Sequence, residues 1–335
     1  MSGHSLLAFS VVSLVAVYKG YPKDRALLLG VFAGIFALLP DVDMFYALVG
    51  VGQSNFGGIW DITHSFWQGS TVTHRGVTHS LVVGSLAGVA FSWFHKRSAY
   101  RVLGVITLIL LTVVSFVVTG LIEAAVMSIF SLAGIATVFV ASRYDLTYRE
   151  VLVVSLFGLV SHPFGDVFTG EPPMFLYPFD YNILETRVTL LPEPTLNLIS
   201  IFMLEITLIW VAILVFTHLM EMRVVSYVNP RAALGALYAI SVFVLPAPTL
   251  DMSYHFVFSV LAMGFVGVTS FPSSYKFPRR SIRGLSTVRI PRLRFPQLYH
   301  RINIDNSLVA VVTGLTAITL ATVAYTAVYV VYLVV

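Results

Sequence analysis

Seven histidine and aspartate side chains in this sequence are candidate ligands for a metal ion. They are His4, Asp41, Asp43, His74, His79, His162 and Asp166. The chain has no cysteine, so the available donors are imidazole nitrogens and carboxylate oxygens. Such donors suit zinc, with manganese or iron as less favoured alternatives. Seven candidates exceed the four donors of one tetrahedral ion, so a two-metal site is consistent with the sequence.

The motif SHPFGDVFTG at 161–170 places His162 and Asp166 four residues apart. On a helix, residues at this spacing share one face and can bind the same ion. A buried, hydrogen-bonded His–Asp pair without a metal explains the spacing equally well. Pro163 is expected to bend the helix locally without excluding either arrangement.

The motif THRGVTHS at 73–80 places His74 and His79 on either side of Arg75, just ahead of an apolar run. The simpler alternative is a helix N-cap by Thr78 with a surface histidine. Ionisable side chains are costly near a bilayer, so three of them together favour a functional site. Guanidinium has no free acceptor for a metal, but its planar fork suits phosphoryl oxygens. We therefore predict a catalytic role for Arg75 beside the metal ions.

The motif LLPDVD at 38–43 presents two carboxylates, Asp41 and Asp43, directly after Pro40. The alternative here is a polar stop at the end of a membrane helix. Paired metal ions about 3.5 to 4 Å apart stabilise both oxygens of an in-line displacement. We predict that Asp41 or Asp43 bridges such a pair and that both are catalytic. His4 taken alone would be an interfacial histidine.

The composition is that of a membrane protein, since 57% of the 335 residues are apolar, 11% are charged and the mean hydropathy is +0.87. A helix needs about 20 apolar residues to cross a hydrocarbon layer of roughly 30 Å. We predict an all-α, polytopic membrane protein with about ten transmembrane helices. The predicted spans are 4–18, 26–40, 77–94, 102–119, 121–142, 150–168, 195–219, 232–247, 254–271 and 307–334.

The distribution of basic residues predicts the orientation, because Lys and Arg are retained on the cytoplasmic side. With ten spans, every Lys and Arg falls on one face except Arg75 and Arg187. Both termini and the candidate site are therefore predicted to be extracytoplasmic. The basic loop at 272–306 is predicted to be cytoplasmic. Charge retention explains this loop, so no nucleic-acid partner is expected, and membrane lipid is the expected partner.

Together these motifs resemble the YdjM-type membrane-bound metal-dependent hydrolases, a family thought to be related to zinc-dependent phospholipase C. The resemblance covers roughly residues 1–180, and it departs from the family pattern at Gly3, at Pro163 and in a long segment at 44–73. It rests on His4, Leu39 to Asp43, His74 to Ser80, Ser161 to Asp166, Thr169 and Tyr177 to Phe179. It implies hydrolysis of a phosphate ester. A site at the outer membrane face favours a phospholipid or lipid-linked phosphate as substrate.

We predict two domains, a hydrolase-like membrane domain of six spans at 1–193 and additional membrane helices at 194–335. Two other function classes remain open. A metal-ion or solute transporter would need ionisable groups deep along several spans, whereas only Glu205 lies clearly mid-span. A non-catalytic metal-binding membrane protein would fill every coordination position. The ligand surplus and Arg75 favour the hydrolase.

Overall fold

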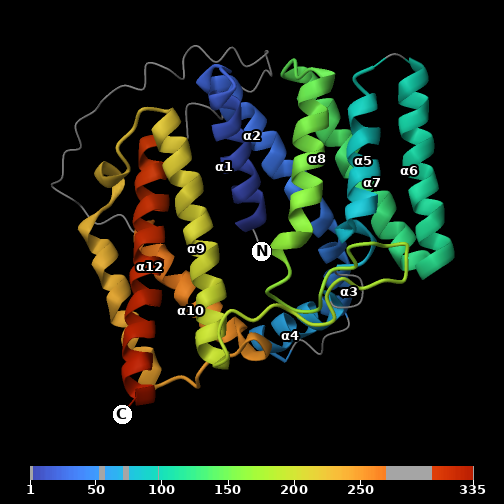
Figure 1. The fold of residues 1–335 in the computed structure, drawn as a ribbon. Coiled ribbons are helices and arrows are strands. Elements are labelled where there is room, and N and C mark those ends of the chain that lie inside the picture. The colour runs from blue at the N-terminus through green and yellow to red at the C-terminus, as the bar shows by residue number, and fades with distance from the viewer. Residues whose placement is uncertain (1–2, 53–56, 71–74, 97, 269–303, 335) are drawn as a thin grey trace. The chain divides into compact units, whose positions relative to one another are not determined.

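The computed structural model describes residues 3–52, 57–70, 75–96, 98–268 and 304–334. These residues form helices and connecting loops with no strand among them, which confirms the predicted all-α class. The chain divides into two compact units, Met1–Val188 and Thr189–Val335 (Figure 1). The assignment of separate functions to 1–193 and 194–335 stays a prediction.

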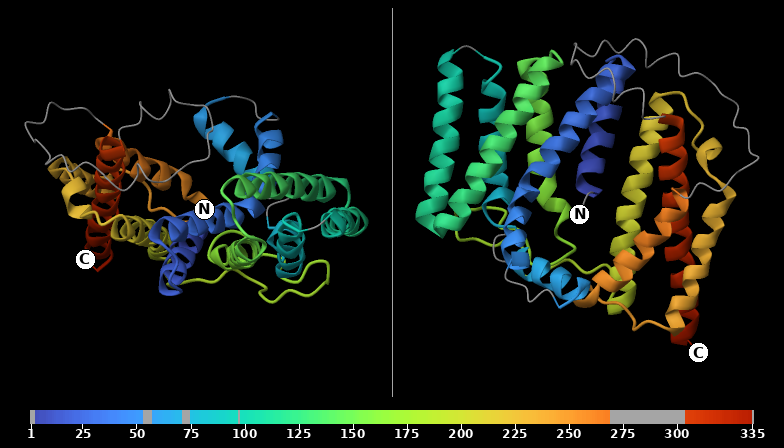
Figure 2. Two further views of the ribbon diagram at one scale, coloured as in Figure 1. Left: turned by 90° about the horizontal axis from the view of Figure 1, so that it is seen from above. Right: turned by 180° about the vertical axis from the view of Figure 1, so that it is seen from behind.

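Unit 1 is built from long helices that run alternately up and down (Figures 1 and 2). This alternation brings the starts of α1, α5 and α7 and the ends of α2, α6 and α8 to one end of the unit. The short helices α3 and α4 lie across that same end. The elements are α1 (Gly3–Tyr18), α2 (Lys23–Leu38), η1 (Leu39–Tyr46), α3 (Ala47–Gly52), α4 (Ile59–Ser70), η2 (Val77–His79), α5 (Leu81–Trp93), α6 (Ser98–Thr119), α7 (Leu121–Arg143) and α8 (Tyr148–Gly165).

Helices α2 and α8 approach closely because Gly158 has no side chain. A Cβ atom at this position would lie 2.6 Å from the Ala33 carbonyl oxygen, 2.7 Å from Phe36 Cβ and 2.8 Å from the Ala37 nitrogen. Small residues allow such backbone approach between membrane helices, where packing rather than the hydrophobic effect drives association. The close approach sets the distance between the ends of α2 and α8, where the candidate ligands lie.

The opposite ends of α2 and α8 are joined by an ion pair between Arg25 and Glu150. Arg25 donates to the two carboxylate oxygens from Nε at 2.9 Å and from Nη2 at 2.6 Å. It also donates to the carbonyl oxygens of Tyr144 and Asp145. Glu150 in turn forms a capping box with Thr147 at the start of α8. Bidentate pairs of this kind fix geometry as well as adding stability, so they hold α2 and α8 in register.

Unit 2 consists of seven helical elements among the described residues. The eighth predicted span, 232–247, is a 3₁₀-helix here, and the ninth begins as an α-helix and continues as a 3₁₀-helix. The length of an apolar stretch does not distinguish these helix types, so the sequence could not predict this. The elements are α9 (Pro194–Leu219), η3 (Val224–Tyr227), η4 (Pro230–Phe243), η5 (Leu250–Met252), α10 (Tyr254–Ala262), η6 (Met263–Gly267) and α12 (Ile304–Val334).

Six helices in the described ranges are long and apolar enough to cross a membrane. They are Lys23–Gly52, Ser98–Thr119, Leu121–Arg143, Tyr148–Phe168, Pro194–Leu219 and Asn306–Tyr332. Four shorter apolar helices complete the set, namely Gly3–Tyr18, Leu81–Trp93, Pro230–Phe243 and Tyr254–Gly267. Each of the ten predicted stretches corresponds to one of these helices. The number of membrane crossings, about ten, stays a prediction.

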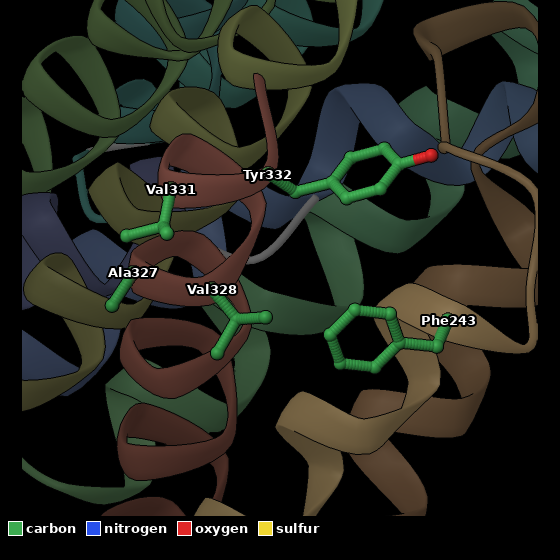
Figure 3. A pocket seen from close by; sticks show the side chains of 5 residues that line it. All are labelled: Phe243, Ala327, Val328, Val331 and Tyr332. Atoms are coloured by element: carbon green, nitrogen blue, oxygen red, sulfur yellow. The ribbon is translucent and has the colours of Figure 1, made fainter. Parts of the chain in front are cut away.

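A pocket in unit 2 lies between the end of η4 and α12 (Figure 3). Phe243, Ala327, Val328, Val331 and Tyr332 line it. The hydroxyl group of Tyr332 is the one polar side-chain group among these residues, and no predicted site residue lines the pocket. The side chains that line this pocket therefore do not indicate a catalytic site.

Gly158→Ala is expected to lower the midpoint of thermal unfolding in detergent. The added methyl group would meet backbone atoms of Ala33 and Ala37 at 2.6 and 2.8 Å, so α2 and α8 would have to separate. Overpacking of this kind costs about 1–3 kcal/mol. Gly52→Ala in α3 is a matched control, because no described residue lies within 4 Å of the place that its methyl group would take. Equal melting temperatures for the two variants would contradict the close approach.

Candidate metal centre

Four side chains from separate parts of unit 1 converge at the end shared by α2, α5 and α8. We refer to Asp41, His79, His162 and Asp166 as the four-donor cluster. One potential ligand atom from each residue lies within 4.8 Å of the other three. All are buried except Asp41, whose side chain is 22% exposed. Two imidazoles and two carboxylates form a donor set that zinc, manganese and iron accept.

The donor atoms face one another around a common centre. His79 Nε2 lies 2.8 Å from His162 Nε2. Asp166 Oδ2 lies 3.1 Å from His79 Nε2 and 3.3 Å from His162 Nε2. Asp41 Oδ1 lies 3.9 Å from His79 Nε2 and 3.6 Å from His162 Nε2. Two nitrogens and two oxygens are thus directed at the same small volume.

The other ring nitrogen of each histidine is held by an acceptor. His162 Nδ1 lies 2.6 Å from the carbonyl oxygen of Ala37. A carbonyl only accepts, so Nδ1 donates and neutral His162 has a lone pair available on Nε2. His79 Nδ1 lies 3.3 Å from Asp43 Oδ2 and 3.1 Å from Thr78 Oγ1. Metal-binding histidines are usually oriented in this way by a carbonyl or carboxylate.

Two buried polar atoms at the cluster make no hydrogen bond among the described residues, namely His4 Nε2 and Asp166 Oδ2. Each lies within ion-pair distance of another side chain of the site, and a bound cation would complete these contacts. The His4 ring packs against His162 with centroids 4.1 Å apart, and its Nε2 lies 3.3 Å from Asp41 Oδ2. The donor set and the unsatisfied atoms therefore fit a divalent cation.

The electrostatics at His79 reflect the surrounding carboxylates. Burial alone lowers the pKa of His79, but the carboxylates of Asp43 and Asp166 outweigh burial and raise the pKa to about 9. Without a metal, the surrounding carboxylates therefore favour the protonated imidazole. A metal ion binds the neutral ring, so it takes the place of that proton.

The 3₁₀-helix η2 places His79 just before α5 rather than in its first turn. Ser80 caps α5, accepting hydrogen bonds from the backbone of Val82 and Val83 at 3.1 and 3.3 Å. The alternative of a cap by Thr78 is therefore wrong. Thr78 instead donates to Asp43 Oδ2 at 3.3 Å. The two side chains before the cap are thus both directed at the cluster or its supporting carboxylate.

Pro163 lies in the last turn of α8 without ending the helix, which continues to Gly165. A proline near a helix end removes one backbone hydrogen bond at modest cost. Asp166 is the C-cap residue, and its backbone N–H donates to the Pro163 carbonyl oxygen at 3.3 Å. The expected convergence of His162 and Asp166 is thus retained at the helix terminus.

Arg75 is held in a strained backbone conformation, with φ at +72°. A residue with a side chain pays about 1–3 kcal/mol for this region. Its backbone N–H donates to Asp43 Oδ2 at 3.1 Å. The guanidinium donates to Thr169 Oγ1 at 2.7 Å and to the Glu171 carbonyl oxygen at 2.6 Å. Burial lowers the pKa of Arg75, while nearby carboxylates, Asp166 foremost, oppose this change.

The predicted site residues fall into three groups. Asp41, His79, His162 and Asp166 form the four-donor cluster. His4, Asp43 and Arg75 surround it: His4 beside Asp41, Asp43 at the far nitrogen of His79, and Arg75 between Asp43 and the loop after α8. His74 lies outside the described residues.

Sequence reasoning missed Glu123, in the first turn of α7. Its carboxylate accepts a hydrogen bond from the backbone of Val77, in η2. The available signal was an isolated acid at the start of an apolar span. Ionisable groups in membrane helices are functional candidates by default, so this signal was present in the sequence.

Comparison with protein-family models matches residues 1–252 to the YdjM inner membrane protein family. The chain belongs to this family. The match extends beyond residues 1–180 and includes the first part of unit 2. No curated protein and no solved structure matches the chain. Membership of the YdjM family and the apolar helices together make this an integral membrane protein, and the four-donor cluster fits a metal-dependent one.

His162→Ala and Asp166→Ala are each expected to reduce the metal content of the purified protein, measured by elemental analysis. Each removes a donor, so the loss should exceed that of Asp43→Asn, which removes an orienting charge and should weaken binding roughly 10- to 100-fold. His95→Ala is the control, because His95 follows α5 at the opposite end of the unit. Full metal content in both donor variants would refute the cluster as a metal centre.

Proposed function

We propose that this membrane protein is a metal-dependent hydrolase that cleaves a phosphate ester. The observation that carries the proposal is the four-donor cluster, in which three residues are buried and Asp41 is partly exposed. Asp41 is 22% exposed, whereas the side chains of His79 and His162 are fully buried. A substrate can therefore approach from the Asp41 side, and an ion that expands beyond four ligands keeps a position for water beside the four donors.

The chemistry requires a cation, which would be held by Asp41, His79, His162 and Asp166. When bound, a divalent ion supplies an activated water near neutral pH and polarises the phosphoryl oxygens. The protein keeps the ligands in place through outer hydrogen bonds. Asp43 holds the far nitrogen of His79, and the Ala37 carbonyl oxygen holds that of His162. Zinc is the proposed metal, because imidazole and carboxylate donors suit it.

Arg75 is proposed to stabilise the negative charge that develops on the phosphoryl group. Its guanidinium is near the carboxylates of Asp41, Asp43 and Asp166, as its electrostatic coupling to all three indicates. Two of its nitrogens donate to the loop after α8, and its Nε is buried with no hydrogen bond among the described residues. Guanidinium carries five N–H donors, so the loop contacts leave donors for a substrate oxygen.

A phospholipid or lipid-linked phosphate is the proposed substrate, because the site lies at one end of a bundle of apolar helices. Large apolar side chains on the neighbouring elements are exposed there, including Phe45 on η1, Leu48 on α3 and Ile59 on α4. Such residues favour the membrane interface, where a lipid phosphate would meet the cluster. The distribution of Lys and Arg supports an extracytoplasmic site.

Arg75→Ala is expected to lower turnover of a phosphodiester or phospholipid substrate by about 10²- to 10³-fold, as when one transition-state donor is removed. Arg75→Lys should recover only part of the rate, since an ammonium group lacks the bidentate fork. Metal content should stay near wild type in both variants.

Thr169→Val is the matched control for Arg75, because it removes a loop contact of the guanidinium but leaves the charge in place. A loop-anchoring role alone would make Thr169→Val resemble Arg75→Ala in both turnover and melting temperature. The proposed charge role requires that Thr169→Val retain most of the turnover.

Single-cysteine labelling tests the proposed orientation, since the natural chain has no cysteine to interfere. An impermeant thiol reagent applied to intact cells should label Glu185→Cys, because Glu185 is exposed and its loop follows α8 at the end with the site. It should label Leu285→Cys only after the cells are opened. The reverse pattern would place the metal centre in the cytoplasm.

A further inference from the structure

The short segment that carries His79 has little internal structure to hold it. The 3₁₀-helix η2 spans three residues, Val77–His79, and its backbone hydrogen bonds run from His79 N–H to the Gly76 carbonyl oxygen at 3.2 Å and from Ser80 N–H to the Val77 carbonyl oxygen at 3.4 Å. Helices this short are marginal without outside contacts. The position of the His79 ring must therefore depend on contacts between the η2 backbone and side chains of other elements.

Two carboxylates hold this backbone from different elements. Asp43, on η1, accepts from the Arg75 N–H at 3.1 Å. Glu123, on α7, accepts from the backbone N–H of Val77. Val77 is 1% exposed, so its N–H has no access to water and needs a protein acceptor. The Glu123 carboxylate is the acceptor that the structure offers to this N–H.

The backbone at Gly76 is shaped to admit the Glu123 carboxylate. A Cβ atom at Gly76 would lie 2.8 Å from Glu123 Oε1 and 3.0 Å from Oε2. The absence of a side chain therefore lets the carboxylate reach the N–H of the next residue. Glu123 also interacts electrostatically with Asp43 and with His79, so its carboxylate lies near both the histidine ring and the carboxylate that orients this ring.

We propose that Glu123 is a positioning residue of the metal centre: by holding the Val77 N–H, it fixes η2 so that His79 Nε2 faces His162 and Asp166. This inference rests on the metal binding in the proposed function but not on the hydrolysis. Glu123 lies behind η2, where its carboxylate contacts Gly76 and Val77, so it acts through the backbone and not as a ligand.

Three substitutions separate a positioning hydrogen bond from a role of the negative charge. Glu123→Gln keeps an oxygen acceptor at the same reach but removes the charge. Glu123→Asp keeps the charge but shortens the side chain by one methylene group, so the acceptor cannot reach Val77 without movement of α7. Glu123→Ala removes both. The full-length protein in detergent, loaded with cobalt(II), gives two readouts: cobalt affinity and the visible absorption spectrum, which reports ligand geometry.

Glu123→Gln is expected to bind cobalt within about threefold of wild type with an unchanged spectrum. Glu123→Asp and Glu123→Ala should bind about 10- to 100-fold more weakly, the usual loss when an outer hydrogen-bond partner is removed, and should shift the spectrum. Weak binding by Glu123→Gln with strong binding by Glu123→Asp would overturn the proposal in favour of a charge role. Unchanged binding in Glu123→Ala would also overturn it. If Glu123→Ala does not fold, the Gln and Asp variants decide.

Glu150→Gln is the matched control, because Glu150 is a buried glutamate whose partners, Arg25 and Thr147, lie at the opposite end of α8. It should lower the melting temperature and leave the cobalt spectrum unchanged. A wild-type protein that binds cobalt but hydrolyses no phosphate ester would count against the proposed reaction alone. A wild-type protein that binds no cobalt would overturn both proposals.

Discussion

The arrangement of unit 1 depends on the balance of charge among carboxylates that have been withdrawn from water. Asp43 and Asp166 are buried, and a buried carboxylate without compensation is costly. Asp43 is partnered by groups of Arg75, Thr78 and His79, and Asp166 by His79 as well as by His162 of its own helix. The charges are therefore fully balanced only when the elements meet. A buried carboxylate would destabilise an isolated helix end, and the same carboxylate stabilises the assembled site once its partners surround it.

This requirement explains why the contacts far from the cluster matter. Asp41 and Asp43 follow α2, whereas His162 and Asp166 end α8, so the distance between these helices sets the distance between donors. The close backbone approach at Gly158 and the Arg25–Glu150 pair fix that distance and the register along the helices. Sites carried by rigid helices hold ligand geometry better than sites on long loops. His79 comes from the shortest of the elements that carry donors, the three-residue η2, and two carboxylates support that segment from outside.

The local part of the site could be predicted from sequence. The spacing of His162 and Asp166 places both on one face of a helix, and this depends only on helix periodicity. The alternation of spans further predicted that the motifs would lie at one end of the bundle. The roles of Asp41 and Asp43 could not be separated from sequence. Both residues lie in η1 two positions apart, and the sequence does not show which of the two side chains faces His162. Their difference arises from contacts with His79, which no local pattern contains.

Asp41 links His4 to the four-donor cluster, because its two carboxylate oxygens face different histidines. Oδ1 faces His79 and His162 within the four-donor cluster, and Oδ2 lies 3.3 Å from His4 Nε2. An ion beside His4 would share Asp41, but among the described residues it would lack the other donors that a tetrahedral ion needs. The described residues therefore provide four donors that could hold one ion. His4 would be coupled to such an ion through the Asp41 carboxylate, which is also the most exposed group of the four-donor cluster.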